Sequence, residues 1–133
     1  MTRKHQSERG SGLVEGALCF LAFLMVTFGV MEFAMAVYTY NFCSWAAEDA
    51  ARWASTRGAN YPSPVTAANV TTHVTNEAIG LSSTPTVTTT WTPNNSPGGT
   101  VQVTVSCTII PLAGVTLHSN LQVSSKAQMT MVN

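Results

Sequence analysis

The sequence contains few charged residues: Lys, Arg, Asp and Glu together make up 9% of its 133 residues, and the formal net charge is zero. Nucleic-acid binding requires a basic surface, so this composition argues against a nucleic-acid partner. Asp49 is the single aspartate, which leaves little from which to build a Ser-His-Asp set. The three histidines are isolated in the sequence, at His5, His73 and His118. We therefore expect no enzyme, no catalytic residues, no metal ligands and no cofactor, with each histidine a polar surface or turn residue.

Long apolar stretches, in contrast, are present. From Leu13 to Tyr40 the only charged residues are Glu15 and Glu32. A membrane-spanning helix needs about 20 mostly apolar residues at 1.5 Å each, so this run of about 28 can cross a bilayer and emerge still helical. A secretory signal peptide is the alternative, but its hydrophobic region is about 7–15 residues long. A retained membrane span is therefore favoured.

The charges before the apolar run predict its orientation. This stretch contains three basic residues and one acidic residue, namely Arg3, Lys4, Arg9 and Glu8. By the positive-inside rule, the N-terminus stays in the cytoplasm and the C-terminal part is exported.

The helix is expected to extend from about Gly12 to Arg57, because an alanine-rich segment follows the apolar run and Gly58 is a good stop signal. Arg52 can form ion pairs with Glu48 and Asp49, at spacings of four and three residues. Such pairs mark either a solvated face or an arginine that joins helices or docks the distal domain. Two tryptophans of this segment are candidates for a membrane anchor or for the domain core, namely Trp45 and Trp53.

The distal part, residues 58–133, is rich in threonine and resembles a small α+β domain in its pattern. A helix is expected to begin near Ser63-Pro64 and to end near Gly80. Alternating apolar residues then predict three strands, over residues 87–91, 101–109 and 121–131. One short helix packed on a three-stranded antiparallel sheet gives a marginal core, so we expect this head to lean on the long helix or on neighbouring subunits.

The three cysteines show no evident internal pair. Cys19 lies deep in the apolar run and Cys107 in the distal domain. An odd number of cysteines in an exported chain permits an intermolecular bridge, for which Cys43 is the best candidate. The simpler interpretation is that all three are small buried hydrophobic residues.

The two glutamates of the apolar run are candidates for function. A charge inside hydrocarbon costs about 2.5 kcal/mol or more, so Glu15 either serves a function or lies at the headgroup level. Glu32 is about 25 Å further along the helix axis, near the outer interface, where it is either solvated or in contact with a partner subunit. Gly12 and Gly16 form a small-xxx-small pair that allows another helix to approach closely.

The pattern around these residues resembles the TadE-like family, the minor pilins or pseudopilins of the tight-adherence (Tad or Flp, type IVc) pilus. The matching segments are Arg9-Gly10, Val14-Glu15, Glu32-Phe33 and the alanine-rich stretch that ends at Arg52. One departure is Gly16, where the family usually carries an aromatic residue.

The resemblance implies a prepilin leader over residues 1–10, cut by a prepilin peptidase between Gly10 and Ser11. A long helix, 11–57, would follow, with its membrane span at about 13–38 and its exported extension at about 39–57. The new α-amino group of Ser11 could then be neutralised by Glu15 of a neighbouring subunit.

The expected protein is a single-pass bacterial inner-membrane protein that primes, caps or joins a pilus or secretion filament. Its expected partners are lipid, other pilin subunits and the pilus assembly platform, and processing could place it in an extracellular pilus. The alternative is an adhesion or binding module, or a membrane-anchored scaffold of the same system, that is not itself polymerised.

Overall fold

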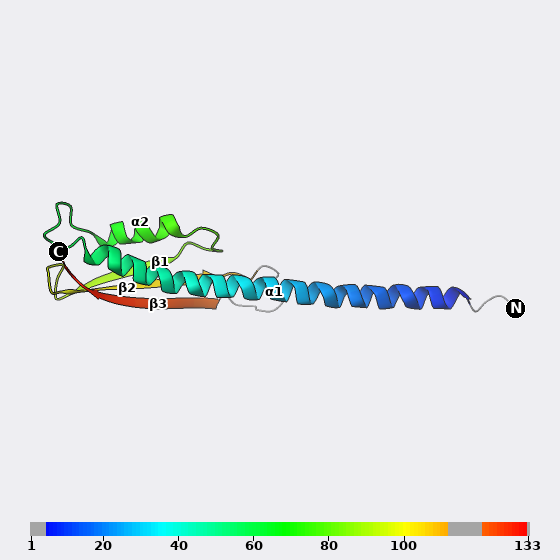
Figure 1. Ribbon diagram of the computed structural model, residues 1–133. Coiled ribbons are helices and arrows are strands. Elements are labelled where there is room, and N and C mark those ends of the chain that lie inside the picture. Colours follow the sequence, from blue (N-terminus) through cyan, green and yellow to red (C-terminus); the bar gives the residue numbers. More distant parts are fainter. Residues whose placement is uncertain (1–4, 112–120, 133) are drawn as a thin grey trace. The chain divides into compact units, whose positions relative to one another are not determined.

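The computed structural model describes residues 5–111 and 121–132, with side chains from Gly10 onward. The side chains of most of the predicted leader are therefore not described, and His118 lies outside the described residues. The elements, in chain order, are α1 (His5–Ser55), α2 (Ala67–Glu77), β1 (Thr86–Thr92), β2 (Thr100–Ile109) and β3 (Leu121–Thr130) (Figure 1). This confirms the predicted α+β class, with a long N-terminal helix, one short helix and three strands.

The chain divides into two compact units, residues 1–34 and residues 35–133, and α1 contributes to both. The helix begins earlier than the predicted start near Gly12, so Gly10 lies within it. A glycine inside a helix costs only about 1 kcal/mol relative to alanine, and long helical stretches with good helix formers can tolerate it.

The end of α1 comes at Ser55, slightly before the predicted Arg57. Side chains bind the carbonyl groups that the last turn leaves without helical partners. The Ser55 hydroxyl donates to the carbonyl oxygen of Arg52 at 2.9 Å, and the Arg57 guanidinium donates to that of Trp53 at 3.0 Å. The chain therefore leaves the helix before reaching the glycine that was expected to stop it.

The three strands form an antiparallel sheet in the order β1-β2-β3. The middle strand is buried at every second residue, as its alternating sequence predicts: Val101, Val103, Val105, Cys107 and Ile109. The residues of β3 that lie opposite these buried residues point to the same face of the sheet, as Ala127 does opposite Val103. One face of the sheet is thus apolar, and the other carries threonine, serine and glutamine side chains.

The core of the second unit lies between this apolar face, α1 and α2. Five alanines of α1 are at most 1% exposed: Ala46, Ala47, Ala50, Ala51 and Ala54. They belong to one cluster with the β2 valines and with Val70 and Val74 of α2. The head therefore leans on the long helix, as its small size predicted. Trp53 packs against this core, whereas Trp45 is half exposed.

A disulfide links Cys43 of α1 to Cys107 of β2, an internal pair that was not evident from the sequence. The two residues are separated by 64 positions, but packing of the helix on the sheet brings their Cα atoms to 6.4 Å. Both are buried, so Cys43 is engaged within the chain and is not available for an intermolecular bridge. Cys19 is a free cysteine and is exposed, so it is not the buried residue that we expected.

Helix α2 begins at Ala67, after the predicted Ser63-Pro64 start. Thr66 caps it, because its hydroxyl accepts a hydrogen bond from the backbone of Asn69 at 3.3 Å. The Asn69 side chain accepts one from the backbone of Thr66 at 3.0 Å, which completes a capping box. The capping box therefore places the start of the helix after Pro64.

Candidate functional site

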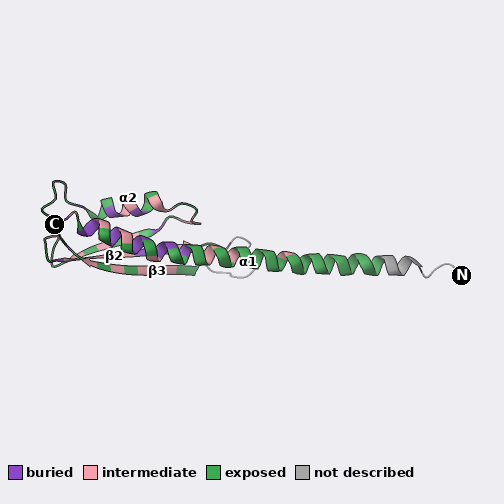
Figure 2. Cartoon of the chain, in the orientation of Figure 1, coloured by how far each residue is buried: buried purple, intermediate pink, exposed green. Residues whose placement is uncertain are grey.

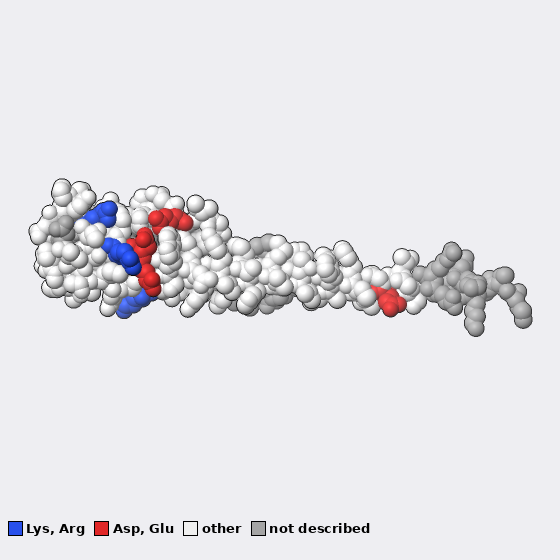
Figure 3. Space-filling view, viewed as in Figure 1, with Lys and Arg blue, Asp and Glu red and all other residues white. Residues whose placement is uncertain are grey.

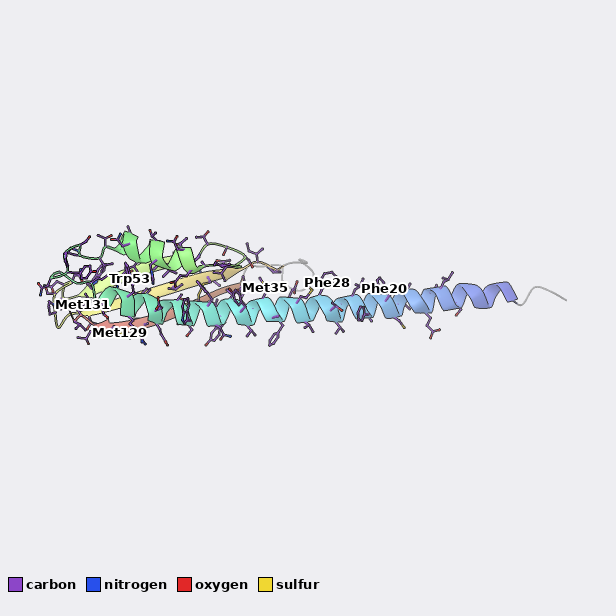
Figure 4. The ribbon with its side chains drawn as sticks, turned by 45° about the horizontal axis from the view of Figure 1, so that its top comes forward. Phe20, Phe28, Met35, Trp53, Met129 and Met131 are labelled. Carbon is purple, nitrogen blue, oxygen red and sulfur yellow. A yellow bond between two sulfur atoms is a disulfide. The ribbon has the colours of Figure 1, made fainter. Side chains whose placement is uncertain are left out.

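The apolar part of α1 in the first unit is uncovered. From Gly10 to Ala34 every side chain is exposed except Leu24 and Glu32, which are partly buried (Figure 2). Its large apolar side chains are highly exposed, for example Phe23 at 64% and Val26 at 68%. Figure 4 shows Phe20 and Phe28 standing out from this helix. A helix that is apolar on all sides requires an apolar environment, either lipid or other helices.

The composition of α1 fits a bilayer. Within the described part of the chain, residues 10–55 form a helix long and apolar enough to cross a membrane, and its most apolar window has a mean hydropathy of 2.2. None of that window is buried within the protein itself. Three half-exposed aromatic residues follow the run, of a kind enriched at membrane–water interfaces: Tyr38, Tyr40 and Trp45.

Small residues and a carboxylate share one face near the start of this span. Gly12 and Gly16 are one turn apart, and Glu15 lies beside them on the helix surface. A Cβ atom added to either glycine would meet no atom within 4 Å. Nothing in the described chain therefore requires glycine at these positions, and this face is open to a close approach by another helix.

The carboxylates of the span lie in different surroundings. Glu15 is exposed, at the level of the two glycines, and close in sequence to the predicted cleavage position between Gly10 and Ser11. Glu32 lies further along the helix and is partly buried. An exposed carboxylate at the end of an apolar helix can bind a cation supplied by a second molecule.

The predicted ion pairs of Arg52 do not form among the residues that the structure describes. Asp49 binds His73 of α2 instead, with the His73 Nε2 donating to the Asp49 Oδ2 at 2.8 Å. Arg52 and Glu48 are exposed. A polar contact between α1 and α2 is thus made by His73, which the sequence suggested was an isolated surface or turn residue. The spacing of His73 and Glu77 places these two side chains on one face of a helix, but it gives no signal that His73 contacts Asp49.

Comparison with known proteins bears on the N-terminal helix. Residues 10–52 match the family model described as TadE-like protein. This segment of the N-terminal helix is similar to the TadE-like family. The matched segment includes both glycines and both glutamates of the span, and it ends at Arg52, three residues before the end of α1. No curated protein and no solved structure matches the chain.

The TadE-like match thus covers most of the helix that is long and apolar enough to cross a membrane. The head, from Gly58 onward, lies outside the matched segment. The short helix and the sheet of the head are therefore known from the structure alone.

Proposed function

We propose that this protein is a TadE-like minor pilin, a single-pass inner-membrane protein that helps to prime, cap or join a Tad-type pilus or a related secretion filament. The observation that carries the proposal is the uncovered apolar helix with its Gly12–Glu15–Gly16 face. Lipid covers this helix before assembly, and neighbouring helices cover it in a filament. The two glycines allow those helices to approach closely.

In the proposed mechanism, a prepilin peptidase cuts between Gly10 and Ser11 and leaves a cationic α-amino group on Ser11. Glu15 of an adjacent subunit neutralises that group. Each charge alone carries a large desolvation penalty at a membrane-level interface, and pairing offsets it. The pair also fixes the axial register of the two helices, because an apolar helix surface alone resists sliding only weakly.

The orientation we propose places the head outside the cytoplasm. The disulfide between Cys43 and Cys107 supports this, because disulfides persist in oxidising compartments such as the bacterial periplasm. The basic residues before the span support the same orientation. In this proposal the protein is not an enzyme, and its partners are other pilin subunits, the peptidase and the assembly platform.

The test is a Glu15→Gln substitution in the native host, with Glu48→Gln as its matched control. Both residues are exposed glutamates of α1, but Glu48 lies in the second unit. We expect Glu15→Gln to abolish or strongly reduce sheared filaments while the protein still accumulates in the membrane, and Glu48→Gln to leave filament number unchanged.

Two outcomes would contradict the proposal. Normal filaments in the Glu15→Gln strain would favour an anchor that carries a binding or adhesion head. Absence of the wild-type protein from filaments, combined with filament loss when it is deleted, would favour a membrane-anchored scaffold.

A further inference from the structure

Three side chains that can bind a metal meet where α1 and α2 pack together. Asp49 comes from α1, and His73 and Glu77 lie one turn apart on α2. The Nε2 of His73 is 2.8 Å from Asp49 Oδ2 and 3.8 Å from Glu77 Oε1, and the three ligand atoms all lie within 4.8 Å of one another. Figure 3 shows acidic side chains next to basic ones on this face of the head.

The histidine is held in place by its surroundings. Its ring stacks on the indole of Trp53, with the centroids 4.7 Å apart and the planes within 10°. The Arg57 guanidinium lies over the same indole, 4.6 Å from its centroid. Buried neighbours anchor the backbone on both helices, since Ala50 and Val74 are at most 1% exposed. The imidazole is therefore fixed in position, with Nε2 directed at the carboxylates.

We propose that Asp49, His73 and Glu77 form a binding site for one Zn²⁺ ion that ties α2 to α1. Zinc binds imidazole nitrogen and carboxylate oxygen at about 2.0–2.2 Å, which places tetrahedral ligand atoms about 3.4 Å apart. The two separations measured from Nε2 lie on either side of that value. Both carboxylates are about one-third exposed, so small side-chain rotations can close the set, with water as the fourth ligand.

The ligand chemistry favours zinc over a hard cation. Calcium takes six to eight oxygen ligands and magnesium needs an octahedral oxygen shell, whereas an imidazole with two carboxylates suits a transition metal. Zinc requires the neutral imidazole with Nε2 unprotonated, so the ring carries its proton on Nδ1 while the ion occupies the present position of the hydrogen bond to Asp49. The two carboxylate charges balance the charge of the ion.

The test is a calorimetric titration of ZnCl₂ into the untagged full-length protein in detergent, with its disulfide intact. We expect one equivalent to bind, MgCl₂ to give no saturable signal, and zinc to raise the melting temperature of the head by about 5 °C or more. His73→Gln should weaken binding by at least about tenfold. His118→Gln, which removes another histidine, should bind as the wild type does.

A second variant keeps the test decisive if His73→Gln folds poorly. Glu77→Gln alters a partly exposed side chain at the end of α2 and should weaken zinc binding without lowering the melting temperature of the metal-free protein. The proposal is overturned if the wild type shows no saturable binding, because the cluster is then only a hydrogen-bonded contact. It is also overturned if Glu77→Gln and a folded His73→Gln both bind zinc as tightly as the wild type.

Discussion

The two parts of α1, one in each unit, present different surfaces. In the first unit, α1 presents large apolar side chains that the chain does not cover, such as Phe23 and Val26. In the second unit, α1 buries alanines against the sheet, with Ala47 and Ala50 at 0% exposure. Both stretches are apolar by composition, but the buried residues of α1 in the second unit are mostly small, with Phe42 as the large exception. Small side chains therefore allow the close packing of the head on α1, whereas the first unit leaves its apolar side chains, large and small, uncovered.

This difference has a physical reason. Alanine allows the sheet to approach the helix backbone closely, so a short α+β head can extend its core onto α1. Large side chains on every side of a helix leave no polar face, so no soluble domain can pack on one side and leave the other in water. The same helix therefore presents an apolar surface long enough to cross a membrane in one unit and contributes to the core in the other.

The largest effect should come from removing the disulfide of the second unit. A Cys43→Ala, Cys107→Ala double variant loses a cross-link over 64 residues, and we expect about 4 kcal/mol less stability in the chain-entropy model. Urea unfolding followed by tryptophan fluorescence measures it. Cys19→Ala, at an exposed cysteine of the first unit, should leave the unfolding curve of the head unchanged. A wild-type dimer that reducing agent separates and that Cys43→Ala abolishes would contradict the internal pairing.

An identical substitution in both parts of the helix sharpens the comparison. Ala50→Leu adds volume at a fully buried position and should destabilise the head by about 1–3 kcal/mol. Ala17→Leu, at an exposed position in the first unit, should leave head stability unchanged. The same urea unfolding experiment compares them. Equal losses in both variants would mean that the two surfaces of α1 do not differ as described.

Glycine substitutions in the two units should have smaller effects that also differ. A Cβ at Gly99 would lie 2.5 Å from the carbonyl oxygen of Asn94, so Gly99→Ala should destabilise the head by about 1 kcal/mol or more. A Cβ at Gly16 would meet nothing, so Gly16→Ala should leave head stability unchanged and yet reduce filament number. Urea unfolding and filament counts from sheared cells measure the two effects. Wild-type filament numbers in the Gly16→Ala strain would argue against close helix packing at this face.

Much of this fold follows from sequence pattern. The strict alternation from Val101 to Ile109 predicts β2, and the apolar run predicts the long helix, because each pattern has the period of its element. The boundaries depend on local hydrogen bonds that periodicity does not report. The capping box of Thr66 and Asn69 sets the start of α2, and side chains at the end of α1 stop that helix before Gly58.

The contacts between distant segments could not be predicted in the same way. Cys43 and Cys107 became partners only when α1 packed on β2, and Asp49 met His73 only when α2 packed on α1. Sequence spacing carries no information on such pairs, because they depend on how whole elements dock. The residues proposed for assembly are Gly12, Glu15 and Gly16. They form a local pattern within one helix, so the sequence alone could identify them as candidates.

The most direct test of the proposed pilin role is the intact mass and N-terminal sequence of the protein extracted from membranes of its native host. We predict that the wild type begins at Ser11, that Gly10→Ala keeps its full length, and that the neighbouring Gly12→Ala is processed normally. A wild-type chain that still carries its basic leader would contradict this account. The protein would then be better described as a membrane-anchored scaffold, with Glu15 a carboxylate at the membrane interface.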